Sequence, residues 1–310
     1  MTYVAVFGAS GRQGLAQVRQ LTAAGHKVRA ISRRADPFYG EDFGAVEVRG
    51  ADIYDEDSAV AAMEGVDAAF YTHPLRARVD RVQGVATIGR AAKRANLKRV
   101  VWNTSSWIPD KAGDPFTYGG NTQAINALWR SGAPATVFGS VLFMVNLLTN
   151  WAFPFIVNEG RYVYPHKPDL ACSWISLDDV AKFMIAALDR PDLEGTWLNI
   201  GGPEVLRPPE VAALLSEAVG HEVRYDPSTP AQFGKHLADA FGDDTGDAER
   251  AIIEPSIAAF YDYNNNSPTK PFRVDMAPVL ERIPVELETM AQWAKRQDWR
   301  LTNKPRPPAG

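Results

Sequence analysis

Three glycines near the start of the chain constrain its fold more than any other feature. They follow an apolar run at residues 3–7 and open a segment with helical spacing at residues 13–23. In a parallel α/β sheet, the first glycine of such a loop permits a tight turn, the second admits a pyrophosphate close to the backbone, and the third lets the helix pack on the strand. The start of the helix adds unpaired N–H groups that favour phosphate. A bare turn would not need three glycines. The loop therefore predicts a dinucleotide site, formed by Gly8, Ala9, Ser10, Gly11, Arg12, Gln13 and Gly14.

The first half of the chain alternates between two patterns. Short runs rich in β-branched and aromatic residues predict strands at 3–7, 27–31, 45–48, 68–71, 99–102 and 135–138. Stretches with helical spacing separate most of them, at 13–23, 58–63, 79–95 and 122–130. Apolar strands separated by helices are typical of a parallel sheet covered on both faces. Gly25, Gly65 and Gly132 stand where helices should end in a left-handed residue. We predict an α/β fold with a doubly wound parallel Rossmann sheet.

The pattern changes after residue 140. Aromatic residues and prolines become frequent, and further helices are predicted at 177–188, 209–219, 230–240, 253–261 and near 285–296, with a strand at 197–200, an acidic loop at 242–249 and a polar turn at 264–267. We predict a Rossmann domain at 1–145, to which segments around 174–200 return. Residues 146–303 are expected to form a smaller C-terminal α/β lobe over the carboxyl edge of the sheet, where ligands bind in such folds. Residues 304–310 are expected to be a disordered tail.

Composition narrows the class of protein. The chain has 33 basic and 37 acidic residues, a net charge of −4, which does not suit a nucleic-acid-binding protein. Its single cysteine, Cys172, cannot form an internal disulfide and is expected to be a small buried residue. No signal peptide is predicted, and the longest aliphatic-aromatic run, at 141–145, is far shorter than the roughly 20 residues of a membrane span. On both grounds the protein is expected to be cytoplasmic. The motifs of metal sites and hydrolases are missing, so no metal is predicted.

The end of the second predicted strand indicates the type of dinucleotide. An NAD site places an acidic residue there, whereas Arg33 and Arg34 suit the 2′-phosphate of NADP(H), and Arg12 could join them. The alternative for this pair is a solvated basic turn. Asp52 and Ile53 follow the third strand, where they would bracket the adenine ring or form the approach to a helix N-cap. His73 and Pro74 follow the fourth strand, beside the expected cofactor.

Two segments carry a more specific signal than the glycine loop. They read Phe-Met-x-Asn at 143–146 and Trp-Ile-Ser-x-Asp-Asp-Val-Ala at 174–181. Together with the loop, Arg33, Asp52 and segments 131–132 and 135–136, they resemble the NmrA-like family of atypical short-chain dehydrogenase/reductases, related to the isoflavone reductase-like enzymes. The resemblance extends to about residue 223. It implies a dinucleotide-binding Rossmann fold and one of two roles. Some members are NADPH-dependent reductases of small aromatic or carbonyl substrates, and others bind the dinucleotide without evident catalysis and regulate a protein partner.

The resemblance also implies catalytic positions. Short-chain dehydrogenases use a serine after the fifth strand, a tyrosine about 13 residues later and a lysine four residues beyond it. Ser105 and Tyr118 match the first two, but the lysine position is Thr122, and the isoflavone reductase-like lysine position is Asn121. Without a neighbouring ammonium, a tyrosine with a pKa near 10 stays protonated at neutral pH, which favours reduction over alcohol oxidation.

Two glycines complicate the role of Tyr118. Gly119 and Gly120 disfavour a helix, so Asn121 is predicted as the N-cap and Tyr118 as part of the preceding loop. Tyr118 is then either a proton donor or a pocket-lining aromatic residue. His73 is the second candidate, as a proton donor or as a hydrogen-bonded loop histidine. Asp178 and Asp179 are expected to cap the helix that follows them.

An aromatic set is expected to line the substrate pocket or to seal the junction between the lobes: Trp107, Tyr118, Phe143, Met144, Trp151 and Phe155. Such a lining favours a flat, aromatic or otherwise apolar substrate over a sugar or a charged metabolite. Two hypotheses follow. We favour an NADPH-dependent reductase that delivers hydride to a carbonyl, enone or imine, with Ser105, Tyr118 and His73 as catalytic candidates. The alternative is a non-catalytic NADP(H)-binding redox sensor that acts on a protein partner. Both leave a homo-oligomer open.

Overall fold

The central sheet has seven parallel strands in the order β3-β2-β1-β4-β5-β6-β10. The computed structural model describes residues 1–32, 46–74, 80–110, 116–240 and 247–300. The strands are β1 (Tyr3–Phe7), β2 (Lys27–Ser32), β3 (Glu47–Gly50), β4 (Ala68–Thr72), β5 (Arg99–Asn103), β6 (Ala135–Ser140) and β10 (Thr196–Ile200). The strand order reverses between β1 and β4, which is where ligands bind in doubly wound sheets. The predicted Rossmann fold is confirmed.

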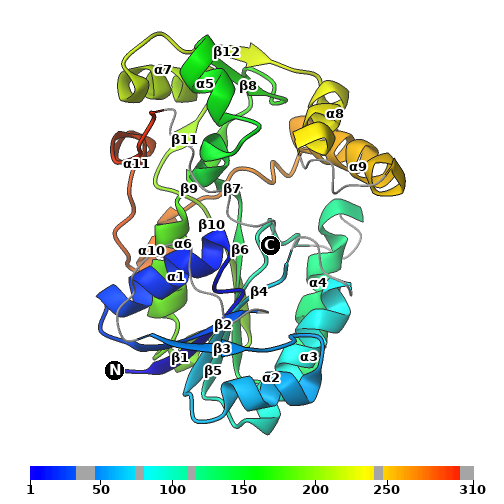
Figure 1. Ribbon diagram of the computed structural model, residues 1–310, viewed down its shortest axis with the longest axis vertical. Helices are drawn as coiled ribbons and strands as arrows, with labels where there is room; N and C mark the ends of the chain where they lie inside the picture. Colours follow the sequence, from blue (N-terminus) through cyan, green and yellow to red (C-terminus); the bar gives the residue numbers. More distant parts are fainter. Residues whose placement is uncertain (33–45, 75–79, 111–115, 241–246, 301–310) are drawn as a thin grey trace.

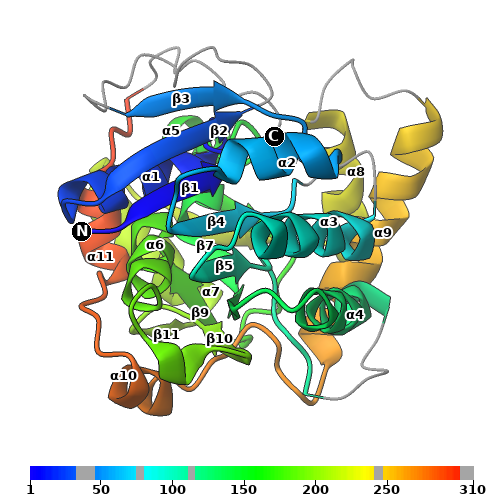
Figure 2. The ribbon, with the colours of Figure 1, turned by 90° about the horizontal axis from the view of Figure 1, so that it is seen from below.

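Helices cover both faces of this sheet (Figures 1 and 2). On one face lie α1 (Arg12–Ala23) and α6 (Leu177–Ala186), and on the other lie α2 (Glu56–Met63), α3 (Arg81–Arg94) and α4 (Phe116–Arg130). Strand β1 shows why two layers are needed, because Val4 and Val6 join one apolar core while Ala5 and Phe7 join the other. This alternation follows from the two-residue period of a strand. The glycines predicted to end helices have positive φ angles, 77° at Gly25, 74° at Gly65 and 71° at Gly132.

The later part of the chain builds a third apolar core. Two small sheets contribute to it, one of β7 (Leu142–Phe143), β9 (Cys172–Ile175) and β11 (Val205–Leu206), the other of β8 (Arg161–Tyr164) and β12 (Arg224–Pro227). The remaining helices are η1 (Met144–Leu148), α5 (Phe153–Glu159), η2 (Pro191–Leu193), α7 (Pro208–Val219), α8 (Pro230–Ala240), α9 (Asp247–Asn266), α10 (Ala277–Arg282) and α11 (Met290–Lys295). We call the part that surrounds this core the small lobe. Cys172 lies in it, 1% exposed, as predicted.

Helix α4 begins earlier than its glycines suggested. It starts at Phe116, so the prediction that Tyr118 lies in a loop and that Asn121 is the N-cap was wrong. Tyr118 is 1% exposed and Asn121 is fully buried. The burial of these two side chains outweighs the cost of two glycines in a helix, which is about 1 kcal/mol each.

This cost gives a testable prediction. The Cβ of an alanine at position 120 would meet no heavy atom within 4 Å. Gly120→Ala should therefore raise the free energy of unfolding by about 1 kcal/mol, because it improves helix propensity without a clash. Urea unfolding of the two proteins measures this difference, and a loss of stability would show that α4 does not include residue 120.

Helix α9 also extends further than predicted. The polar turn expected at residues 264–267 was wrong for Asn264, Asn265 and Asn266, which form the last turn of α9. Asn264 is 1% exposed and its Nδ2 donates to the carbonyl of Phe260. At the other end of the small lobe, α11 begins only at Met290, where Thr289 is the N-cap. Within the described ranges, no helix has both the length and the apolar character to cross a membrane.

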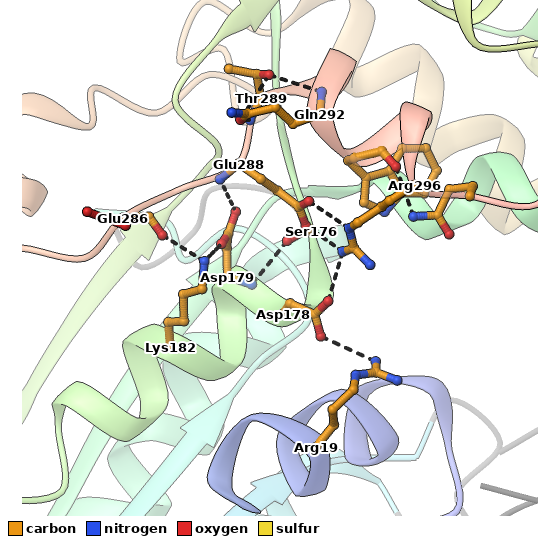
Figure 3. A network of polar contacts seen from close by, with 12 residues as sticks. Arg19, Ser176, Asp178, Asp179, Lys182, Glu286, Glu288, Thr289, Gln292 and Arg296 are labelled. Atoms are coloured by element: carbon orange, nitrogen blue, oxygen red, sulfur yellow. Dashed lines mark hydrogen bonds and ion pairs between the residues drawn. The ribbon is translucent and has the colours of Figure 1, made fainter. Parts of the chain in front are cut away.

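The start of α6 carries a polar network (Figure 3). Its N-cap is Ser176, whose Oγ accepts from the backbone N–H of Asp179 at 3.0 Å, so the capping role predicted for the two aspartates was wrong. Asp178 instead lies between Arg19 of α1, at 3.2 Å, and Arg296 beyond α11, at 2.8 Å. Asp179 accepts from Lys182 at 2.7 Å and from the backbone of Glu288 at 3.0 Å. The carboxylates thus tie the C-terminal segment to α6 and α1.

Candidate functional site

The glycine loop joins β1 to α1 in a conformation that requires its glycines. Gly8 has a φ of 74°. A Cβ at Gly14 would lie 2.2 Å from the Gly8 carbonyl oxygen and 2.5 Å from the Ala9 Cα, so only glycine allows α1 to approach β1 this closely. The N-cap, Gly11, provides no side-chain cap, which leaves the first-turn N–H groups of α1 for a ligand. These features fit the pyrophosphate of a dinucleotide.

Other residues of the loop differ in exposure. Ala9 is buried and its N–H donates to the Ile31 carbonyl at 3.0 Å, which fixes the loop to β2. Ser10 is partly buried and Arg12 is exposed. Arg33 and Arg34 lie outside the described residues, so their predicted contact with a 2′-phosphate stays a prediction.

Gln13 connects the glycine loop to the end of β5. Its Nε2 donates to Ser105 Oγ at 2.9 Å, and its Oε1 accepts from Asn103 Nδ2 at 2.6 Å. Asn103 is fully buried and its Oδ1 accepts from Ser140 Oγ at 2.8 Å. Strands β5 and β6 and the loop after β1 therefore share one hydrogen-bond network. Asn103 was not among the predicted site residues. Its signal is an amide that ends a strand directly after the apolar residues at 100–102.

Ser105 has an unusual backbone. Its φ is 60°, a region that non-glycine residues rarely adopt. Such a conformation costs of order 1–3 kcal/mol, and residues that adopt it cluster at active sites and ligand-binding sites. Because Ser105 Oγ accepts from Gln13, the hydroxyl hydrogen is left to donate elsewhere. Ser105 follows β5 at the carboxyl edge of the sheet, as predicted.

Tyr118 lies on α4 but faces the small lobe. Its hydroxyl donates to Asn264 Oδ1 at 2.8 Å, and its ring packs against Trp107, Phe260 and Tyr263. Burial raises its pKa well above the usual value of 10, so the phenol stays protonated. Asn264 was missed by sequence reasoning because its neighbours suggested a polar turn.

Asn121, at one of the two lysine positions, is fixed on all sides. Its Nδ2 donates to Ser106 Oγ at 2.9 Å and to the Trp107 carbonyl at 2.8 Å. Its Oδ1 accepts from Nη1 of Arg81, the first residue of α3. The site therefore has an arginine near the point where related sequences are expected to have a lysine, and sequence reasoning missed it because Arg81 lies on another helix.

His73 and Pro74 follow β4, next to the glycine loop. His73 Nδ1 lies 2.8 Å from the hydroxyl of Tyr71, and its ring packs so closely on Gly84 of α3 that a Cβ there would lie 2.7 Å from it. His73 is partly buried. Its position agrees with a loop histidine that has a hydrogen-bond partner, and its proton-donor role stays a prediction.

The turn after β3 contains Asp52 and Ile53. Asp52 is exposed, and its Oδ1 accepts from the N–H of Tyr54 at 3.0 Å. The cap of α2 is Asp55, which accepts from the Ser58 N–H at 2.7 Å. Ile53 is partly buried against the second core. Their contact with an adenine ring stays a prediction.

The predicted aromatic lining is spread over two regions. Trp107 packs edge-on against Tyr118 at 5.4 Å near the start of α4. Trp151 is 8% exposed and packs against Tyr164 and Phe233 in the core of the small lobe. Phe155 of α5 contacts His236 and Arg161. Phe143 is partly buried against the first core and Met144 is 1% exposed. The structure thus places Trp107 near Asn121, and Trp151 and Phe155 in the small lobe.

The family follows from a comparison over almost the whole chain. The model of the NmrA-like family matches residues 2–281. The chain belongs to the NmrA-like family. Among its relatives is an NAD(P)H azoreductase of Xenophilus azovorans, 31% identical over 223 residues that cover 72% of this chain and 76% of that protein. A (4-alkanoyl-5-oxo-2,5-dihydrofuran-3-yl)methyl phosphate reductase of Streptomyces griseus is 28% identical over 283 residues, covering 87% and 95%.

Solved structures show the same fold as this NmrA-like chain. NmrA, a negative transcriptional regulator solved in complex with NADP, superposes with a TM-score of 0.74 at 18% identity, over 95% of this chain and 94% of that one. At this identity the similarity establishes the fold alone. The two curated relatives are named as reductases, while a transcriptional regulator shares the fold.

Proposed function

We propose that this protein is an NADPH-dependent reductase of a small aromatic or otherwise unsaturated substrate, a carbonyl, enone or imine. The observation that carries the proposal is the geometry of Ser105, held in a left-handed conformation at the carboxyl edge and hydrogen-bonded to Gln13 of the glycine loop. The similarity to an NAD(P)H azoreductase and to a second reductase supports it.

The glycine loop would hold the dinucleotide. Its backbone at residues 8–14 and the uncapped start of α1 would bind the pyrophosphate. Arg12, Arg33 and Arg34 are proposed to bind the 2′-phosphate, which selects NADPH over NADH. When bound, the nicotinamide supplies the hydride. His73 and Pro74, at the end of the neighbouring strand β4, are proposed to border the nicotinamide side of the site.

Ser105 is proposed as the catalytic hydrogen-bond donor. The Gln13 amide occupies a lone pair of Ser105 Oγ, which orients the hydroxyl and leaves its hydrogen to donate to the atom on which negative charge develops. Tyr118 is proposed as a positioning residue, because its hydroxyl is engaged with Asn264 and its ring holds Trp107. The network of Gln13 and Asn103 is formed before any substrate enters, so little reorganisation is needed in the transition state.

Two hydroxyl deletions test this assignment. Ser105→Ala should lower kcat by about 100-fold or more, the effect of removing one preorganised donor. Tyr118→Phe should lower kcat by less than tenfold but lower the free energy of unfolding by about 1–3 kcal/mol, because Asn264 Oδ1 loses its partner in the core. NADPH oxidation and urea unfolding measure both effects. If Tyr118→Phe has the larger effect on kcat, Tyr118 is the donor.

One observation favours the sensor alternative. The residue at a lysine position, Asn121, is buried and its amide is fully engaged, so it cannot reach a nicotinamide ribose. A sensor must distinguish the two redox forms, since equal affinities would shift no equilibrium. Calorimetric titration with NADPH and with NADP+ tests whether the protein is a redox sensor. Similar dissociation constants would exclude sensing, whereas a tenfold difference without turnover would support it.

A further inference from the structure

Arg81 brings a positive charge to the carboxyl edge of the sheet. Its side chain is partly buried, and burial lowers its pKa. Its contact in the structure is the amide oxygen of Asn121, which is neutral. Across the described ranges, no carboxylate pairs with it. Two other arginines of α3 differ, because Arg90 and Arg94 both pair with Glu56.

Among the described residues, a neutral amide orients this guanidinium. Both hydrogens of the Asn121 amide are used, on Ser106 Oγ and the Trp107 carbonyl, so the amide oxygen is fixed where it accepts from Arg81 Nη1. A guanidinium has five N–H donors, and one contact leaves most of them for a ligand. Holding a charge away from water is costly unless an opposite charge joins it. The forked donors of arginine match carboxylate, sulfonate and phosphate.

The position of Arg81 in the site indicates whether its anionic ligand is the substrate or the dinucleotide. Its partner Asn121 is bound to the segment directly after β5, next to Ser105. Strand β4 lies between β5 and β1, so β5 is roughly 10 Å from the strand that carries the glycine loop. Arg81 therefore lies toward the substrate side of the site rather than at the start of α1.

We propose that Arg81, oriented by Asn121, binds an acidic substituent of the substrate: a carboxylate, sulfonate or phosphate carried by the aromatic or unsaturated group. This inference rests on the proposed function. It departs from the sequence-based expectation of an uncharged substrate, because it adds an acidic substituent to the apolar group that the aromatic residues would contact. The phosphates of the dinucleotide have the same chemistry, and the experiment separates these two sources.

The test compares naphthalene-2-sulfonate with naphthalene-2-sulfonamide, which has nearly the same shape but no charge. Both are titrated calorimetrically into the full chain saturated with NADP+. The wild type should bind the sulfonate roughly tenfold or more tightly than the sulfonamide, and the difference should shrink as salt is raised. Arg81→Gln, which keeps a donor for Asn121, should abolish the preference. Arg81→Lys should retain part of it, and Arg90→Gln, which removes a charge from the same helix, should leave it intact.

The outcomes separate the sources of the anion. Equal binding of the two probes to the wild type overturns the proposal without any variant. A preference that survives in Arg81→Gln also overturns it. If Arg81→Gln instead weakens NADP+ tenfold and leaves the sulfonate preference unchanged, the arginine serves a dinucleotide phosphate and the proposal is wrong. A protein that prefers the sulfonate but consumes no NADPH would retain this anion site and refute the proposed function.

Discussion

Lowering the pH from 7.5 to 5 should lower the free energy of unfolding by about 2 kcal/mol through one histidine, His166. Its ring is 2% exposed among Tyr164, Trp174 and Phe272. Burial lowers its pKa from 6.5 to about 3. The unfolded chain therefore binds the proton first. The stabilisation is complete above pH 6.5 and is lost as the pH falls toward 3.

His166→Phe isolates this contribution. Nε2 of His166 is buried without a partner among the described atoms, so a phenyl ring of similar shape should be tolerated. Urea unfolding at pH 7.5, 6 and 5 measures the stability of both proteins. The difference between them should shift by about 2 kcal/mol in favour of the variant at pH 5, while His26→Gln controls for the loss of one histidine. Parallel pH profiles for wild type and His166→Phe would contradict the expectation.

Gly14→Ala should abolish tight dinucleotide binding. The new Cβ would lie 2.2 Å from the Gly8 carbonyl oxygen, so α1 must move away from β1. Overpacking of this kind costs roughly 1–3 kcal/mol of stability. Because the backbone N–H groups of the loop move with α1, we expect the affinity for NADPH to fall at least 100-fold. Fluorescence titration with NADPH measures the affinity, and urea unfolding measures the stability.

Gly120→Ala is the matched control, since it makes the same substitution in open space on another helix. It should leave the NADPH affinity unchanged. Gly25→Ala adds a second comparison, because Gly25 has a φ of 77° but no atom near its Cβ position. It should cost about 1 kcal/mol of stability and leave binding intact. If Gly14→Ala binds NADPH as tightly as the wild type, the loop is a structural turn and not the dinucleotide site.

Local sequence patterns were sufficient to predict where the strands of the central sheet and the glycine loop lie. These patterns depend on interactions between residues that are close in the sequence. Examples are apolar strands, helical spacing and C-cap glycines such as Gly65. The patterns failed to predict the start of a helix that depends on a contact between residues far apart in the sequence. Gly119 and Gly120 suggested a break, but α4 begins before them because Tyr118 is buried by residues of α9.

The polar network of the site shows the same limit. Ser105 could be proposed from its place after the fifth strand. Its contact with Gln13 joins residues 92 positions apart, and the contact of Arg81 with Asn121 joins residues 40 positions apart. No local spacing encodes such pairs. The cap of α6 failed for a different reason: Ser176 and the two aspartates after it are all good caps, and only the geometry shows that Ser176 is used.

Transfer of deuterium from the cofactor to a product is direct evidence of hydride transfer by this protein. The full chain is incubated with NADPH that carries deuterium at both nicotinamide C4 positions and with a panel of aromatic ketones, enones and imines. The masses of the products are then measured by mass spectrometry. We expect at least one product to gain a single deuterium, in proportion to the NADPH consumed. Binding of NADPH with no consumption above the protein-free rate across the panel would contradict it.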